Sequence, residues 1–276
     1  MSKRRLDVLL LDRGLAPSRE KAQALVMAGQ VTVDERPAVK PGTLVADDVG
    51  LSVAHGPRYV SRGGEKLEHG LAEFGIDPTG LVAADVGAST GGFTDCLLQH
   101  GAAKVYAVDV GHGQLDYRLR NDGRVVVMEG VNARELKLPE GVDMAVVDVS
   151  FISLRLVLPA VAGVVGARRT AGGNLKVAPT AVRSAAAVWS GKAVRSAAVG
   201  TIVALFKPQF EAGKNEVPRG GVIRDPLFHA TLIGRFAGWL TDNGFRILGL
   251  AASPILGAEG NREFLFWLRP VKGGAA

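Results

Sequence analysis

The lysine in the segment "LFKPQFE" holds the position most suggestive of chemistry. Lys207 ends an apolar run and is followed directly by Pro208. Because a proline restricts the residue before it to extended backbone, we expect this lysine at the end of a strand, with its side chain at the mouth of a sheet. An ammonium group held there can orient a substrate hydroxyl or take its proton, and the sequence leaves both roles open.

Three further charged residues can meet Lys207 around one substrate atom. Asp148 ends the run "MAVVDVSF", Glu263 precedes "FLFWL", and Lys66 lies in a segment with helical spacing. Alternatively, Lys66 could be a solvated helix residue, Asp148 a cap, and Glu263 the start of an edge strand. Two amines and two carboxylates suit a ribose 2′-hydroxyl, which is a poor nucleophile until its proton is removed or strongly hydrogen-bonded. In-line positioning could then supply most of the catalysis.

A glycine-rich stretch, "DVGASTGGFTD" (residues 85–95), follows the first apolar run of this region and opens a helical segment. Gly87 permits a tight turn, and Gly91 and Gly92 would let the backbone approach a ligand closely. Such a loop can cradle a cofactor, although a purely structural strand-to-helix turn has the same pattern.

Two acids beside this loop favour one cofactor over another. A dinucleotide fingerprint has glycine where this chain has Ser89, and Asp85 at the strand end would repel a pyrophosphate. Asp109, at the end of the next run, can accept hydrogen bonds from ribose hydroxyls. S-adenosylmethionine has a ribose, a positive amine and a sulfonium but no phosphate. The sequence therefore predicts S-adenosylmethionine rather than NAD.

The elements that must position these residues are seven apolar runs, which alternate with helical segments from residue 80 onward. Most runs are continuously apolar and β-branched, as in parallel strands that are buried on both faces. Ligands of such sheets bind beyond the carboxyl ends of the strands. Four of the residues discussed above lie at such ends: Asp85, Asp109, Asp148 and Lys207. We expect an α/β fold with a seven-stranded, mostly parallel sheet whose last two strands can pair antiparallel. The runs are "LVAADVGA", "KVYAVDVG", "RVVVMEG", "MAVVDVSF", "TIVALFK", "RILGLAASP" and "REFLFWLRP".

Residues 166–200 interrupt this alternation. The motif "AVRSAA" occurs there twice, and the segment holds six basic residues and no acid. We expect an insertion, because a compact domain rarely needs so long a connection. The net charge of +6 is accounted for by this segment, so the charge of the whole chain is weak evidence for a nucleic-acid partner.

Composition excludes several classes of protein. The chain has 276 residues, of which 47% are hydrophobic, which is enough for an ordinary α/β domain and a smaller unit. Its single cysteine, Cys96, excludes an internal disulfide framework. The basic N-terminus has too short an apolar run for a signal peptide, and no stretch approaches the roughly 20 apolar residues of a membrane span. We expect a soluble cytoplasmic protein with no metal site.

Residues 1–60 form a separate basic unit in the sequence pattern. "SREKAQALVMAG" predicts a helix that begins after the N-cap Ser18 and ends at Gly29. "QVTVDERPAVKPG" predicts a short strand, a turn through residues 34–36 and a second strand. The basic side chains could be solvated surface residues or could bind RNA. They are Arg4, Arg5, Arg13, Arg19, Lys21 and Lys40, with Arg62 just beyond the unit.

This first unit resembles the S4 RNA-binding domain. The resemblance is carried by "RLDVLLLDRGLAPSREKAQALVMAGQVTVDERPAVKPG", with its Arg–Leu–Asp start, Ser–Arg helix entry, Gly–x–Val–x–Val strand and closing Lys–Pro. It implies a small α+β domain that binds RNA. After it, residues 61–78 are expected to be a linker and first helix, with Gly63–Gly64 as a flexible joint, and residues 79–276 the α/β domain.

Residues 59–270 resemble the FtsJ-type ribose 2′-O-methyltransferases, and the two-domain layout resembles the TlyA family of rRNA (cytidine-2′-O)-methyltransferases. The matching segments are "VSRGGEKL", "DVGASTGGFTDCLL", "VYAVDVGHGQL", "LRNDGRVVVMEGVNAR", "VVDVSFISL", "LFKPQFEAGK" and "GNREFLFWL". The resemblance implies a Rossmann-like class I methyltransferase that uses S-adenosylmethionine to methylate a cytidine ribose in ribosomal RNA. Large-subunit rRNA is the expected target, with small-subunit rRNA left open.

The same resemblance assigns roles to individual residues. It implies ribosomal RNA or ribosomal subunits as partners, and it leaves the 166–200 insertion as a departure from the short link usual in the family. The implied catalytic tetrad is Lys66, Asp148, Lys207 and Glu263. The implied S-adenosylmethionine site is Asp85, Gly87, Ala88, Ser89, Gly91, Gly92, Phe93 and Asp109, with Glu129 and Asn132 on the adenine side.

Three other functions compete with this one. The protein could be an RNA-binding ribosome-assembly factor whose methyl transfer is incidental. It could be a haemolysin, a label that this family often carries, although no amphipathic or apolar stretch suits pore formation. A nicotinamide-dependent oxidoreductase is disfavoured by Ser89 and by the phosphate-averse Asp85.

Overall fold

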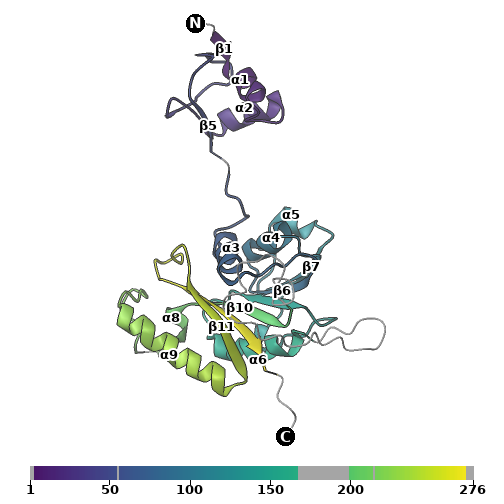
Figure 1. The fold of residues 1–276 in the computed structure, drawn as a ribbon, viewed down its shortest axis with the longest axis vertical. Coiled ribbons are helices and arrows are strands. Elements are labelled where there is room, and N and C mark those ends of the chain that lie inside the picture. Colours follow the sequence, from purple (N-terminus) through teal and green to yellow (C-terminus); the bar gives the residue numbers. More distant parts are fainter. Residues whose placement is uncertain (1–2, 55, 167–198, 214, 272–276) are drawn as a thin grey trace. The chain divides into compact units, whose positions relative to one another are not determined.

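The computed structural model describes residues 3–54, 56–166, 199–213 and 215–271 of the chain. These residues form two compact units, Met1–Arg58 and Tyr59–Ala276, which are coloured along the sequence in Figure 1. The expected insertion at 166–200 lies almost wholly outside the described residues. Each unit is described by itself below.

The first unit packs two helices against short strands, as its sequence pattern predicts. Ser18 caps the second helix, since its side chain accepts a hydrogen bond of 3.2 Å from the backbone N–H of Lys21. Asp34 and Glu35 both have positive φ and form the expected tight turn between two strands. The core includes Leu6, Leu10, Ala22, Val26 and Val31. The elements are β1 (Lys3–Arg5), α1 (Leu6–Asp12), α2 (Arg19–Met27), β2 (Val31–Val33), β3 (Arg36–Pro37), β4 (Leu44–Ala46) and β5 (Leu51–Val53).

The second unit is built on a seven-stranded sheet in the order β11-β12-β10-β9-β6-β7-β8. The five strands from β10 to β8 are parallel, and β12 runs antiparallel to both β10 and β11 (Figure 1). The seven predicted strands and the antiparallel last pair are therefore confirmed. Their bounds are β6 Val82–Val86, β7 Lys104–Val108, β8 Val125–Met128, β9 Met144–Val147, β10 Thr201–Phe206, β11 Phe245–Ala252 and β12 Phe264–Pro270.

Helices cover both faces of this sheet and create one core on each. Alternate residues of one strand enter different cores: Val82, Ala84 and Val86 face one, and Ala83 faces the other. This explains why the strands are apolar without interruption. Helices α3 (Gly63–Phe74) and α4 (Gly92–Gln99) cover one face, and α6 (Leu154–Val164) and α9 (Pro226–Asp242) cover the other. The shorter helices are α5 (Tyr117–Arg120), η1 (Ala133–Glu135) and α8 (Pro208–Glu211).

The expected flexible joint at Gly63–Gly64 is wrong, because these residues form the first turn of α3. A Cβ atom on Gly64 would lie 2.2 Å from Cγ of the buried Tyr59. The glycine is therefore required for close packing of an aromatic ring rather than for freedom of the backbone. Among the helices of the described ranges, none combines the length and apolar character that crossing a bilayer requires.

Candidate active site

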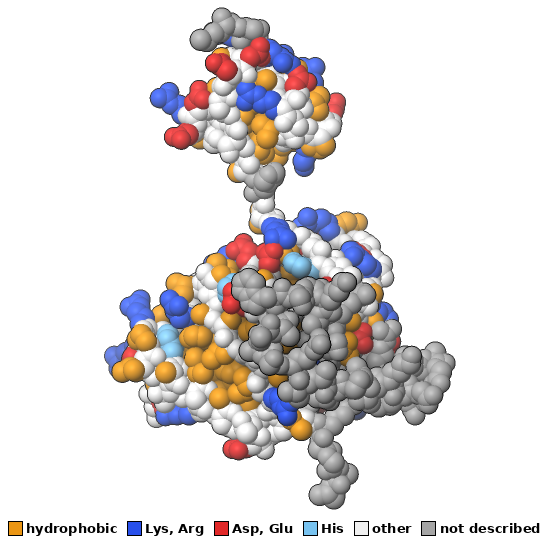
Figure 2. Space-filling view, viewed as in Figure 1, with side chains coloured by type: hydrophobic (Ala, Val, Ile, Leu, Met, Phe, Trp, Pro, Cys, Tyr) orange, Lys and Arg blue, Asp and Glu red, His pale blue; other side chains and the backbone are white. Residues whose placement is uncertain are grey.

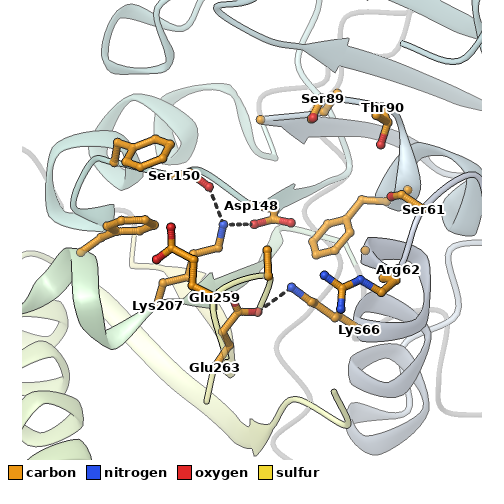
Figure 3. A pocket seen from close by; sticks show the side chains of 18 of the residues that line it. Ser61, Arg62, Lys66, Ser89, Thr90, Asp148, Ser150, Lys207, Glu259 and Glu263 are labelled. Carbon is orange, nitrogen blue, oxygen red and sulfur yellow. Dashed lines mark hydrogen bonds and ion pairs between the residues drawn. The ribbon is translucent and has the colours of Figure 1, made fainter. Parts of the chain in front are cut away.

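A cavity of about 330 Å³ opens at the carboxyl ends of β6, β9 and β10 in the second unit (Figure 3). All four residues of the expected tetrad line it: Lys66, Asp148, Lys207 and Glu263. They come from helix α3, from the residues directly after β9 and β10, and from the residue before β12. The prediction that these four side chains converge is thus supported by the geometry, although their catalytic roles stay a prediction.

Lys207 has the extended backbone that Pro208 was expected to impose, with φ −115° and ψ 102°. Its Nζ lies 2.7 Å from Oδ1 of Asp148 and donates a hydrogen bond of 2.8 Å to Oγ of Ser150. The lysine side chain is 10% exposed and the aspartate side chain 21%. The ammonium group is therefore fixed by two partners at the cavity wall, while Pro208 begins the short helix α8 behind it.

Lys66 and Glu263 form a second ion pair in the same cavity. Nζ of Lys66 lies 2.6 Å from Oε2 of Glu263, and the two side chains are 11% and 4% exposed. A Cβ on Gly257 would lie 2.4 Å from the other carboxylate oxygen of Glu263, so a larger residue there would displace the Glu263 carboxylate. Taking two charged pairs out of water costs free energy that apolar residues would not cost. The two pairs are therefore weak evidence for a role in stability, and they mark the cavity as a candidate functional site.

The glycine loop adjoins this cavity, and Gly87, Ala88, Ser89, Gly92 and Phe93 line it. The expected reason for the glycines needs correction. A Cβ on Gly92 would lie 2.2 Å from Oγ of Ser61, and a Cβ on Gly87 would lie 2.4 Å from the backbone oxygen of Asp148. These two glycines are therefore required because other segments of the chain pack against them, rather than because a ligand does.

Gly91 fits the same explanation, because its φ is 97° and a Cβ there would lie 2.3 Å from Cδ1 of Leu119. It lines neither this cavity nor the smaller one beside Asp109 that is described below. Its role is to turn the backbone into α4 against packed leucines, and direct contact of Gly91 with a cofactor is not supported.

Asp85 is also placed differently from the expectation. It is fully buried within β6 and lines neither cavity. Oγ1 of Thr94 donates a hydrogen bond of 2.7 Å to its Oδ2, whereas its Oδ1 is buried without a hydrogen-bond partner in the part of the chain that the structure describes. The pKa of Asp85 is raised from 3.8 to about 7, mainly by burial and to a smaller extent by the neighbouring Asp148, while the hydrogen bond from Thr94 opposes the shift.

Asp109 directly follows β7 and lines a second, smaller cavity that shares Ala88 and Ser89 with the first. Its two oxygens accept hydrogen bonds from the backbone N–H groups of Ser89, at 2.8 Å, and of Gly111, at 2.7 Å. A carboxylate held by two amides has lone pairs left for ribose hydroxyls, and their binding by Asp109 stays a prediction.

The two residues expected on the adenine side lie in different surroundings. Glu129 lines the second cavity, where it accepts a hydrogen bond of 2.9 Å from the backbone of Gly113. Its ion pair with Arg120 holds the pKa of its carboxyl below the usual value. Asn132 instead caps η1 by accepting from the backbone of Arg134, and it lines neither cavity. The structure thus brings Glu129 to the cofactor loop but not Asn132.

Several cavity residues were missed by the sequence analysis. Ser150 and Phe151 lie just after Asp148 in the chain, and Phe210 lies on α8. Phe151 is 86% exposed, has an unusual positive φ of 63°, and its ring lies 5.2 Å from that of Phe210. Aromatic rings such as the exposed Phe151 and the half-buried Phe210, at the mouth of a polar cavity, can stack on a nucleobase. The signal in the sequence was the phenylalanine that follows both Asp148 and Lys207 by three positions.

Glu211 joins the two segments that carry Asp148 and Lys207. Its carboxylate accepts hydrogen bonds of 2.6 Å from Oγ of Ser153 and from the backbone N–H of Leu154, at the beginning of α6. Burial raises the pKa of Glu211. This brace fixes the spacing between the ends of β9 and β10, on which the geometry of the site depends.

The basic residues of the first unit are partly occupied with its own structure. Arg5 and Arg19 both hydrogen-bond the fully buried Asp7, and Arg5 in particular holds the pKa of that carboxyl well below its usual range. Arg4 pairs with Asp12, and Arg13 donates to two backbone oxygens. On the face shown in Figure 2, basic and acidic side chains of this unit are interspersed.

The side chains of the other predicted RNA-binding residues make no such contacts in the part of the chain that the structure describes. The side chains of Lys21, Lys40 and Arg62 make no hydrogen bond or ion pair within the described ranges, and Arg62 lines the cavity that holds the two ion pairs. RNA binding by any of the basic residues remains a prediction. No group of three or more His, Cys, Asp or Glu residues in the described chain is arranged to hold a metal ion.

Comparisons with known proteins agree with this geometry. Residues 59–270 match the family model of the FtsJ-like methyltransferases, and residues 4–48 match that of the S4 domain. The chain is 44% identical over 271 residues to the 16S/23S rRNA (cytidine-2′-O)-methyltransferase TlyA of Mycobacterium tuberculosis, across 96% of this chain and 89% of the relative. It is 39% identical to Hemolysin A of Brachyspira hyodysenteriae, across 95% of this chain and 98% of that protein.

Solved structures give the same result. A Streptococcus thermophilus protein named as a hemolysin is 39% identical, has a TM-score of 0.64, and is covered over 90% of its length by 99% of this chain. One from Lactococcus lactis, also named as a hemolysin, is 40% identical with a TM-score of 0.62, covering 78% of this chain and 89% of its own. The chain therefore belongs to the TlyA family, in which an S4 domain precedes an FtsJ-like methyltransferase domain.

Proposed function

We propose that this protein transfers a methyl group from S-adenosylmethionine to the 2′-hydroxyl of a cytidine in ribosomal RNA. The observation that carries the proposal is one cavity in which two lysine–carboxylate pairs adjoin a glycine loop at the carboxyl ends of parallel strands. The M. tuberculosis relative is named for this reaction, and it matches nearly the whole chain.

The residues beside the glycine loop fit S-adenosylmethionine. Asp109, whose two oxygens accept from the backbone N–H groups of Ser89 and Gly111, can also accept hydrogen bonds from ribose hydroxyls. This carboxylate does not suit a phosphate, because like charges repel. When bound, S-adenosylmethionine supplies an electrophilic methyl group on a positively charged sulfur, and no activation by a metal is required.

The two ion pairs then have different tasks in binding the 2′-hydroxyl. Lys207, fixed by Asp148 and Ser150, would donate a hydrogen bond to the oxygen and hold its lone pair toward the methyl group. The hydroxyl proton can pass to the carboxylate of Asp148 as the new O–C bond forms and the bond from the methyl carbon to sulfur breaks, which leaves the electron pair on sulfur. Lys66, fixed by Glu263, would hold the same oxygen from the opposite wall of the cavity. Positioning of this kind can supply many orders of magnitude in rate.

The S4 domain would bind the RNA, with Lys21 and Lys40 as the basic side chains not committed to contacts within their own unit. We expect the substrate to be large-subunit rRNA in the cytoplasm, presented free or in a ribosomal subunit, with small-subunit rRNA as the second candidate.

The test is transfer of radiolabelled methyl groups from S-adenosylmethionine to isolated large and small ribosomal subunits and to their naked rRNA. Mapping of the 2′-O-methylated position follows. We expect label at the ribose of a cytidine with the native protein and none with Lys207→Ala. Label on a base, or on no RNA at all, would refute the proposed reaction.

A further inference from the structure

Glu259 differs from the other two carboxylates that line the catalytic cavity. Asp148 and Glu263 are each paired with a lysine, as the dashed lines in Figure 3 show. Glu259 lines the same cavity and is exposed, yet it makes no hydrogen bond or ion pair with any residue in the described ranges. An unpaired negative charge thus stands where a polyanionic RNA must enter.

The backbone around Glu259 is held in place although its side chain is free of contacts in the described ranges. The residue lies in the loop between β11 and β12, where Gly260 donates to the backbone oxygen of Gly257 at 3.0 Å and Gly257 donates to that of Asn261 at 2.9 Å. The fully buried side chain of Asn261 in turn bonds the backbone of Ile223 and Gly221. The carboxylate is therefore presented to the cavity from a fixed turn.

Electrostatics restrict what this carboxylate can contact. Near a phosphate of the bound strand it would weaken binding, because like charges a few ångströms apart repel even in water. The groups of RNA that a carboxylate can accept from are hydroxyls and base N–H donors. On the base edge of cytosine, the exocyclic N4 amine is such a donor, and Asp or Glu is its usual partner in proteins. Uracil carries a carbonyl oxygen at the same place, which a carboxylate repels.

The apolar part of the cavity gives a base a place to lie. Phe151 and Phe210 line the same cavity as Glu259, and Nζ of Lys207 lies 5.9 Å from the centroid of the Phe210 ring. A nucleotide whose 2′-oxygen meets Lys207 would therefore have its base near these rings, within the same enclosure as the carboxylate of Glu259.

We propose that Glu259 is a specificity-determining residue that accepts a hydrogen bond from the N4 amine of the target cytidine, and so selects cytidine over uridine at the methylated position. This inference rests on the proposed function, since it assigns the base that the same site reads.

The test compares methyl transfer to two versions of one RNA, with cytidine or uridine at the mapped position, by the native protein and by Glu259→Gln and Glu259→Ala. Native protein should prefer cytidine by about 5- to 150-fold in kcat/KM, the range of one good base contact. Glu259→Ala should lose most of this preference. Glu259→Gln should gain activity on uridine, because its amide N–H can donate to the uracil carbonyl.

Glu73→Gln is the matched control, because it removes an exposed carboxylate from α3 of the same unit without touching the cavity. It should keep the native preference, and all variants should bind S-adenosylhomocysteine as the native protein does. A preference within twofold of native in both Glu259 variants, or an equal loss of activity on both RNAs, would overturn the inference. Native protein that methylates neither RNA would refute the proposed function itself, and the role of Glu259 with it.

Discussion

Replacement of Asp85 by Asn should make the stability of the second unit less dependent on pH. Asp85 is fully buried in β6, and burial raises the pKa of its carboxyl from 3.8 to about 7. Asparagine has nearly the same shape, can still accept the hydrogen bond from Thr94, and cannot ionise. The comparison therefore isolates the cost of ionising one carboxyl in the core.

The sign and size follow from proton linkage. Between about pH 4 and 7 the carboxyl is ionised in the unfolded chain but protonated in the folded one, so the folded state binds more protons and its free energy of unfolding falls as pH rises. The limiting slope for one proton is about 1.4 kcal/mol per pH unit, which sums to about 4 kcal/mol over this window. Below pH 4 both states are protonated, and above pH 7 the difference is constant.

Urea unfolding at a series of pH values, followed by tryptophan fluorescence, measures this effect. The described tryptophans, Trp239 and Trp267, both lie in the second unit, so the signal reports on the sheet that contains Asp85. The free energy of unfolding of Asp85→Asn minus that of the native protein should rise by about 4 kcal/mol from pH 4 to 7. Thr94→Val removes the hydrogen bond that favours the ionised form of Asp85, so it should raise the pKa of this carboxyl further. The free energy of unfolding of this variant should therefore keep falling to a higher pH than that of the native protein. A difference that does not change with pH would show that Asp85 is ionised throughout, and the argument from burial would be wrong.

Three further changes test the site and the first unit. Lys207→Ala should lower the rate of methyl transfer at least about a hundred-fold and leave the affinity for S-adenosylhomocysteine nearly unchanged in calorimetry, because the contact proposed for the lysine is with the substrate oxygen. Activity within a few-fold of native would contradict this proposed contact. Gly64→Ala should destabilise the second unit by about 1–3 kcal/mol in urea, since its Cβ would meet Tyr59 at 2.2 Å, whereas a flexible joint would tolerate alanine. Lys21→Ala combined with Lys40→Ala should reduce the slope of log affinity for RNA against log salt by roughly 1.5 with no change in melting temperature; an unaltered slope would show that these lysines touch no phosphate.

The sheet could be predicted because its pattern depends on burial alone. Five parallel strands covered by helices on both faces must be apolar throughout, and the runs in the sequence showed this directly. The antiparallel pair at the end followed from the short connection between β11 and β12. The convergence of Asp148 and Lys207 followed in turn, because neighbouring parallel strands end at one edge of the sheet.

Contacts between neighbours within the chain could not be predicted in this way. The sequence shows that Arg5 and Arg19 are positively charged, but their charge does not reveal that the buried Asp7 binds both of them. Gly64 has the same local signature as a flexible joint, and only the ring of Tyr59 in contact with it shows that it is a packing residue. In both cases the deciding partner is identified by three-dimensional packing, which residue types in sequence order do not contain.

A single position along a strand separates Asp85 from the acids that enter the cavities. Asp109 and Asp148 each come directly after the last residue of their strands, β7 and β9, and both line a cavity. Asp85 is the last residue but one of β6, so its side chain still follows the alternation of the sheet and enters the core beneath α4. At the carboxyl end of a strand, a shift of one residue therefore decides whether a carboxylate enters a cavity or the core. Because strand ends estimated from sequence are uncertain by more than that, the sequence could predict the edge of the sheet but not which of its carboxylates faces the ligand.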